Sequence, residues 1–391
     1  MPQSDDDNNG AGGSSDQTTL ALKRHITALQ EENSNLKGAT EKKSQLSGRV
    51  VRRLVTLTAR VEDLICESDR RVALNEANEG ENVDEHSKSE ERAYRSYRQL
   101  VRWYPSIERI VGSQSDPYQL RMVYTHIMHG ADGARGDDAA NLKVAVAAWL
   151  MEDGNTNLRL KDKSGRGFYN DTTGKLLCPV DYNWHDERIK RNIRAYHPDY
   201  IVTAYSWPAF LYTDCKYDSK NPAKGLFKGQ LLVRAFKYIF TSPSSAEEPA
   251  GNNEDEGQDQ PQAPLRKRRK TSNSGERRTR SCVASLLGMT SVQPRAIAYI
   301  AVQLRFALSN CCSWRAVDED FDHDEFYNNI VDHFERPASA GARQVVSDLL
   351  FWWNREVFGR ANVLSYRPQA IEKLSVAMSS ADSRVPSPDP V

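Results

Sequence analysis

The 391-residue sequence lacks several features that would place it in a common class of protein. It holds no apolar run of the ~18 to 20 residues that a helix needs to span a bilayer, so we expect no membrane partner. Residues 1–17 are acidic and polar, the opposite of a secretory signal or a mitochondrial transit peptide. A segment this polar has little to bury, and we predict that it is disordered. Together these absences predict a soluble protein inside the cell.

Disulfide and reaction motifs are also missing. The six cysteines are scattered, with no Cys-x-x-Cys pair, which favours a reducing compartment over a disulfide scaffold. Basic and acidic residues number 53 each, so no overall field attracts nucleic acid or an acidic membrane. The low apolar fraction predicts one sizeable core with disordered ends and an insert, rather than two domains.

What is present begins with a heptad pattern in residues 18–67, which predicts an N-terminal coiled coil. The first block has leucines seven residues apart and places Asn33 where a buried asparagine fixes the register of a parallel dimer. The pattern weakens near Gly38 and resumes in the same phase. The expected self-association residues are Leu22, Ile26, Leu29, Asn33, Leu36, Val50, Leu54, Leu57, Val61 and Leu64. We therefore predict a homodimer; the alternative is that the second block docks on the protein's own core.

The rest of the chain predicts one irregular multi-helix domain, so the expected fold class is mainly α. The expected segments are an acidic linker at 68–92, helical parts at 93–242 and 291–364, an insert at 243–290, and a mostly disordered tail at 365–391. Asp116 and Pro117 are typical of a helix start. We predict that this helix stops at Gly130, and that a glycine-rich turn leads to a second, alanine-rich helix ending near Glu152.

Residues 200–212 are the most aromatic stretch of the chain. Such rings could stack on bases or line a ligand pocket, but no lysine or arginine is interleaved before Lys216, which favours a packed core. Apolar helices are expected at 226–239 and from Pro294 onward. Their similar length and spacing predict that they pack together, with the insert as a loop between neighbours.

The insert, residues 243–290, places an acidic, proline-rich piece before a dense basic run. We predict that it is disordered and carries a nuclear-import signal, since import requires an exposed, extended basic cluster. The expected signal residues are Arg266, Lys267, Arg268, Arg269, Lys270, Arg277 and Arg278. The alternatives are a solvated run neutralised by the acidic piece and a salt-sensitive contact with phosphates. A basic helix face expected at 186–196 fits solvent or phosphate in the same way.

Two residue pairs are candidates for chemistry. His126 and His129 have a spacing that could bind a metal from one helix, but no carboxylate lies beside them at helical spacing. Cys178 and His185 would make a nucleophilic thiol–imidazole pair only if the fold brings them together. We favour structural roles for all four.

Residues 318–333 alternate aspartate with other residues and contain two histidines. As a calcium loop the segment fails, because Glu325 stands where a glycine is required. A metal site from these side chains stays open, but we favour Asp322 or Asp324 as the cap of a following helix. No catalytic residue, cofactor or metal ligand is therefore expected with any specificity.

A resemblance supports this organisation. The run Ser206-Trp207-Pro208 with Phe210-Leu211-Tyr212, the helix that ends at Ser242-Pro243-Ser244-Ser245 and the helix over 295–308 are similar to an uncharacterised family of mushroom-forming fungi, known only as a domain of unknown function. The likeness covers residues 160–360. It implies no activity and no cofactor. It does imply that both sides of the insert form one domain, with the coiled coil outside it.

The sequence thus predicts a non-enzymatic, self-associating interaction protein in the nucleus, carried there by an import receptor. The cytoplasm is the alternative location. A second interpretation is a DNA- or RNA-binding protein that uses the basic insert. A third is an unrecognised or degenerate enzyme.

Overall fold

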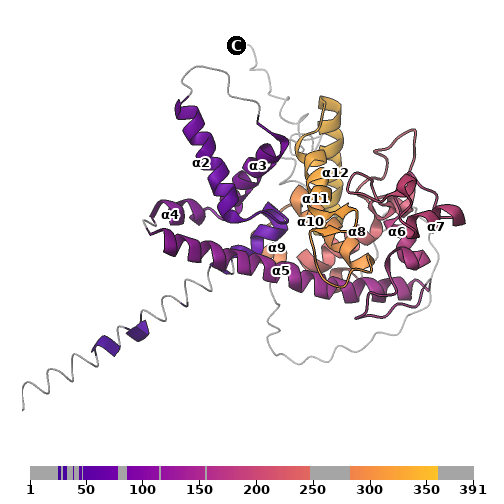
Figure 1. Cartoon of the computed structure of the whole chain (residues 1–391), viewed down its shortest axis with the longest axis horizontal. Helices are drawn as coiled ribbons and strands as arrows, with labels where there is room; N and C mark the ends of the chain where they lie inside the picture. Colours follow the sequence, from indigo (N-terminus) through magenta and orange to yellow (C-terminus); the bar gives the residue numbers. More distant parts are fainter. Residues whose placement is uncertain are drawn as a thin grey trace, which may run out of the picture.

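The computed structural model describes residues 25–27, 30–32, 38, 44–45, 47–77, 86–113, 116–154, 156–246 and 282–359. These residues are mainly helical, with one small two-stranded hairpin, which confirms the predicted fold class (Figure 1). The segments predicted to be disordered at 1–17 and 365–391 lie outside the described residues, as does most of the insert.

The helices and strands follow one another along the chain as labelled in Figure 1. The α-helices are α2 (Val61–Ala77), α3 (Lys88–Trp103), α4 (Ser106–Ser113), α5 (Pro117–Glu152), α6 (Asp171–Leu177), α7 (Glu187–Arg194), α8 (Gln230–Phe236), α9 (Val283–Leu286), α10 (Pro294–Leu308), α11 (His323–Glu335) and α12 (Ala340–Phe358). Strands β1 (Val317–Asp318) and β2 (Phe321–Asp322) pair antiparallel. Two π-helical turns, η1 (Val51–Val55) and η6 (Lys237–Thr241), and the 3-10 turns η2 (Gly167–Tyr169), η3 (Pro198–Tyr200), η4 (Ala209–Leu211), η5 (Thr213–Cys215) and η7 (Ser244–Ala246) complete the set.

Helix α10 lies at the centre of the hydrophobic core. Every residue of it after Pro294 is buried, and it packs against α5, α8, α11 and η1. The predicted contact between the two apolar helices on either side of the insert is therefore confirmed, because α8 and α10 lie side by side. The aromatic stretch also joins the core: Phe210, Leu211 and Tyr212 are buried, and the Trp353 indole donates a hydrogen bond to the Phe227 carbonyl.

Helix α5 runs without a break along the length of the molecule (Figure 1). Asp116 caps its start, as predicted, by accepting a hydrogen bond from the Tyr118 amide. The predicted stop at Gly130 is wrong, because the helix continues to Glu152 as one element. The glycine has a different role there, which depends on the N-terminal segment.

That segment, residues 44–50, crosses α5 at very short range. A methyl group at Gly48 would lie 2.0 Å from the Ile127 carbonyl oxygen, and one at Gly130 would lie 2.0 Å from the Gln45 carbonyl oxygen. No real Cβ approaches backbone this closely, so only glycine on both sides permits the contact. Gly130 is therefore needed for close packing and does not end the helix.

The second heptad block follows this crossing and enters the core. The block comprises Val50, Leu54, Leu57, Val61 and Leu64, all at most 4% exposed. The helical path also breaks within the block, since η1 ends at Thr56 in extended backbone and α2 begins only at Val61. Using these five residues for self-association, in one coiled coil over 18–67, is therefore wrong; the docking alternative holds for them. Heptad spacing and the spacing of an amphipathic docking segment are nearly the same, so the sequence did not separate them.

Buried polar contacts fix this segment further. The Arg53 guanidinium donates two hydrogen bonds to the Asp138 carboxylate on α5, at 2.8 and 2.7 Å. The Tyr299 hydroxyl on α10 donates to the same carboxylate at 2.8 Å. Arg295 reaches the Val55 carbonyl and forms an ion pair with Glu335 on α11. The N-terminal segment is thus part of the folded body.

The predicted acidic linker at 68–92 is shorter than expected. Its first residues continue α2 to Ala77, and its last ones begin α3, where Ser87 and Glu90 form a capping box. Arg71 of α2 and Glu91 of α3 form an ion pair at 2.9 Å, so the two helices make a hairpin. Acidic composition alone suggested a linker, but here it provides caps and ion pairs.

Candidate functional site

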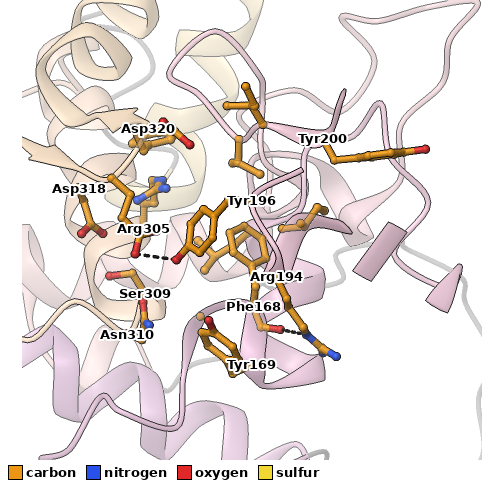
Figure 2. A pocket seen from close by; sticks show the side chains of 17 residues that line it. Phe168, Tyr169, Arg194, Tyr196, Tyr200, Arg305, Ser309, Asn310, Asp318 and Asp320 are labelled. Carbon is orange, nitrogen blue, oxygen red and sulfur yellow. Dashed lines mark hydrogen bonds between the residues drawn. The ribbon is translucent and has the colours of Figure 1, made fainter. Parts of the chain in front are cut away.

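One cavity has walls from segments that are far apart in the sequence. It lies between the turn η2, α7 and the residues after it, the end of α10, and the β1–β2 hairpin (Figure 2). Its volume is about 50 Å³, which is room for a few water molecules or the edge of one flat group. We call it the hairpin cavity. The side chains that give it chemical character are Tyr169, Arg194, Tyr196, Arg305, Asp318, Glu319 and Asp320.

Three cationic side chains are buried in this region, and two of them are fully used by the fold. The Arg166 guanidinium, 1% exposed, donates to the carbonyls of Lys143, Ala307, Arg159 and Leu160 at 2.7 to 3.2 Å. The Lys163 ammonium donates to the Cys311 carbonyl at 2.5 Å and lies 3.4 Å above the Phe306 ring. Burial lowers the pKa of Lys163 to about 7. These two cations hold the 156–167 loop onto the end of α10.

Arg305, the third cation, lines the cavity. Its side chain is buried, and Nη1 lies 3.2 Å from Nε2 of His323, while the guanidinium carbon lies 3.2 Å from the centre of the Phe321 ring. Burial lowers the pKa of Arg305 to about 9, against the opposing effect of Asp318 and Glu319. Burial and then Arg305 lower the pKa of His323 to about 3. The imidazole is therefore neutral and Nε2 accepts.

The hairpin forms an acidic wall opposite. Glu319 accepts a hydrogen bond from the Tyr196 hydroxyl at 2.7 Å, and this bond raises the pKa of Tyr196. Both residues have left-handed backbone, with φ of 53° at Tyr196 and 57° at Glu319. Such backbone at a non-glycine residue costs about 1 to 3 kcal/mol and persists only where the surrounding structure fixes it. Asp318 lies 3.8 Å from Arg315, while Asp320 is exposed.

Aromatic rings and arginines form the remaining wall. Tyr169 and Tyr196 are 59% and 51% exposed, so the core does not need these rings. On α7, Arg188, Arg191 and Arg194 follow one another at a spacing of three and share one side of the helix. Arg194 donates to the Phe168 carbonyl at 2.7 Å and lies 3.3 Å from Asp171 (Figure 2). The basic face expected at 186–196 is thus confirmed as a helix surface, and it borders the cavity.

The structure does not support a nucleophilic site at Cys178. The thiol is buried, and it donates to the Pro179 and Tyr182 carbonyls. Burial raises the pKa of Cys178 to about 12. A nucleophilic cysteine needs the opposite shift, produced by a base or a nearby cation. A thiol–imidazole pair of Cys178 with His185 is therefore a wrong interpretation.

The metal hypotheses also fail in the described part of the chain, where no group of three or more His, Cys, Asp or Glu side chains is arranged to hold a metal ion. The candidates in 318–333 have other partners. Asp322 caps α11, as predicted, through the amides of Asp324 and Glu325. Asp332 forms ion pairs with the arginines of α3, and His323 is enclosed by aromatic rings. His129 lies on α5 beside an open groove formed with α2.

The predicted import signal lies outside the described residues, and so does most of the first heptad block. Only Ile26 of that block is described. It lies in a helical segment and is 51% exposed, and its described neighbours in 25–32 are exposed as well.

Sequence reasoning missed the hairpin cavity. The alternating aspartates near 318 suggested calcium, whereas they build the tip of a β-hairpin. Arg305 stands in an apolar helix, where a single arginine suggests a solvated edge. A clearer signal was the arginine itself, since its position within the buried stripe of α10 requires a buried charge.

Comparison with known proteins gives one match. A model described as a family of unknown function (DUF6698) matches residues 129–358, which include the whole hairpin cavity. No curated protein and no solved structure matches the chain. The expected likeness to a domain of unknown function over 160–360 is therefore confirmed and begins earlier than predicted. Within the described residues, no helix combines the length and apolarity needed to cross a membrane.

Proposed function

The chain belongs to this family of unknown function (DUF6698), and we propose that it is a non-enzymatic, self-associating interaction protein of the nucleus. The observation that carries the proposal is the contrast between the two heptad blocks. The second block is enclosed in the core, whereas Ile26 of the first block stands exposed on a helix. An exposed isoleucine at a heptad position is what a second copy of the helix would cover.

The structure changes which segment carries the self-association. Val50 to Leu64 belong to the folded body, so the interface is assigned to the first block alone: Leu22, Ile26, Leu29, Asn33 and Leu36. A buried asparagine at position 33 would favour a parallel pair in one register, at some loss of stability. Two such short helices associate weakly unless the folded bodies add contacts.

Light scattering on the full chain and on a chain without residues 1–40 tests the proposal. The deletion leaves the crossing at Gly48 and the second block intact, so the body keeps its core. We expect twice the chain mass for the full protein and a monomer for the truncated one. Leu29→Glu should act like the deletion, while Glu31→Gln, at an exposed position of the same helix, should leave the mass unchanged. A monomeric full chain, or a dimer that survives the deletion, would refute the assignment.

Nuclear import is proposed from the basic run alone, with an import receptor as partner. Replacing Arg266 to Lys270 by alanine should move a tagged protein to the cytoplasm. Replacing the same arginines by lysine keeps the charge and should leave the protein nuclear. A nuclear alanine variant would contradict the import proposal.

A second candidate function is nucleic-acid binding, and one observation favours it. The arginines of α7 border a cavity with exposed tyrosines, a combination that suits phosphates and bases. Retention on nucleic acid should then decrease steeply with salt. If alanine substitutions in the insert abolish retention while Arg188→Gln and Arg191→Gln do not, the insert alone is responsible.

A further inference from the structure

We propose that the hairpin cavity binds a guanine-type base, held by Arg305 and Asp320 at its edge and stacked on Tyr169 and Tyr196. The site goes beyond the proposed self-association and deepens the nucleic-acid candidate. A free nucleotide and a guanine of a single strand share the chemistry that the cavity would recognise. The argument rests on what each wall of the cavity requires from a ligand.

The Arg305 wall requires an acceptor. A guanidinium has five N–H donors, and here the hydrogen bond to His323 uses only one nitrogen. Arg166 shows the contrast, because four carbonyls satisfy it. Among the described residues no carboxylate pairs with Arg305, although the cavity gives access to its side chain. A ligand oxygen would occupy the unused donors and compensate a charge that burial makes costly.

The hairpin wall requires a donor. Asp320 is exposed on the rim, and none of the described side chains forms an ion pair with it. Glu319 is held by Tyr196, and Asp318 lies near Arg315. An ionised carboxylate only accepts hydrogen bonds, and its two oxygens match two adjacent N–H groups.

The ligand therefore presents an acceptor beside two donors, and the tyrosines require a flat or cationic group. A lysine-like cation suits the carboxylates and the rings but meets Arg305. A phosphate or carboxylate suits Arg305 but meets three acidic side chains. The guanine edge carries a carbonyl oxygen beside ring and amino N–H groups, and its face stacks on an aromatic ring. It satisfies all three walls at once, whereas adenine has no carbonyl for Arg305.

The arginines of α7 would receive the phosphate. Arg194 lines the cavity, and Arg191 and Arg188 continue along the same side of the helix. A base at the hairpin would thus place its sugar and phosphate toward a row of guanidinium groups, which bind phosphate oxygens in pairs.

Titration calorimetry of the full chain with guanosine monophosphate, adenosine monophosphate and guanosine tests the site. We expect saturable binding of the guanine ligands, about tenfold or more tighter than adenosine monophosphate. Asp320→Asn should weaken the guanine ligands by about tenfold or more and remove the preference. Tyr169→Ala should weaken both nucleotides through loss of stacking. Arg191→Gln should weaken the nucleotide but leave guanosine unchanged.

Both Asp320 and Tyr169 are exposed, so these variants should fold. Asp214→Asn changes an exposed carboxylate outside the cavity and should bind as the unchanged protein does. Equal affinity for the two nucleotides, no saturable binding of guanine ligands, or an unaffected Asp320→Asn variant would overturn the proposal. Binding of trimethyllysine in place of guanosine would do the same and would assign the cavity to a cation.

Two further arms identify the source of the base. Tighter binding of a guanine-containing single strand than of the mononucleotide would assign the site to nucleic acid, and the reverse to a free nucleotide. Strand binding that is lost with the insert substitutions while guanosine monophosphate still binds would separate the failure of the nucleic-acid candidate from the failure of the base site.

Discussion

Replacing Gly130 of α5 by alanine tests the close helix crossing that anchors the N-terminal segment. Two effects of opposite sign act at this position. Alanine in a helix interior is favoured over glycine by about 0.8 to 1.0 kcal/mol. Against this, the new methyl group would lie 2.0 Å from the Gln45 carbonyl oxygen, where ordinary contact begins at 3.4 Å. The obstacle is backbone, so the two segments must move apart by about 1 Å or more.

The same helix provides a matched control. Gly133 and Gly136 also lie within α5, and a methyl group at either position meets no atom within 4 Å. Alanine at these sites should therefore stabilise the protein by up to about 1 kcal/mol. Because the propensity gain is common to all three variants, the difference between Gly130→Ala and Gly133→Ala isolates the steric cost. Overpacking a well-packed contact typically costs about 1 to 3 kcal/mol, which is the expected difference.

Urea unfolding followed by circular dichroism measures this difference, with limited proteolysis to detect release of residues 44–50. Gly48→Ala meets the Ile127 carbonyl from the other side and should cost a similar amount. The double variant should cost less than the sum, since one displacement relieves both contacts. If Gly130→Ala proves as stable as Gly133→Ala, with the N-terminal segment still protected, the crossing does not exist as described.

Three further predictions follow from the buried cations and thiols. Arg166→Met should destabilise the protein by about 3 kcal/mol or more, because it leaves buried carbonyls without a donor, whereas Arg159→Met, at an exposed position, should stay within about 0.5 kcal/mol in urea unfolding. Lys163 has a folded pKa of about 7 against 10.5 when unfolded. The unfolded chain then binds more protons between these values, so stability should rise from pH 7 to 10, and Lys163→Met should abolish that rise. His323, with its pKa lowered to about 3, should make stability fall as pH drops below about 6.5; His323→Gln should reduce this slope, and an unchanged slope would contradict the buried neutral imidazole. With a thiol reagent, Cys66 and Cys312 should react first and Cys178 only after unfolding; fast labelling at position 178 would contradict its burial.

Local signals in the sequence predicted the local structure well. The caps at Asp116 and Asp322 and the proline that opens α10 each act within one turn, so their geometry can be read from neighbouring residues. The packing of α8 on α10 was also predictable, because two apolar segments of equal length need each other in one core.

The errors arise where one residue type serves two purposes. Gly130 was expected to end a helix, but glycine also permits close approach, and the sequence does not show what lies opposite. The leucines at 54, 57 and 64 keep the heptad phase, yet their partners are α5 and α10 of the same chain. The hairpin cavity combines residues from 167 to 321, and no spacing rule connects positions so far apart.

The segment from Val50 to Leu64 has a consequence for where the folding unit begins. The matched family segment starts at residue 129, but the core is completed by side chains from well before it, and α10 would lose its contact with η1 without them. A fragment cut at the family boundary would expose this apolar groove and should aggregate. The heritable module and the physical domain are thus different lengths of chain. Any relative shortened at its N-terminus would have to close the same groove with another segment or with a second molecule.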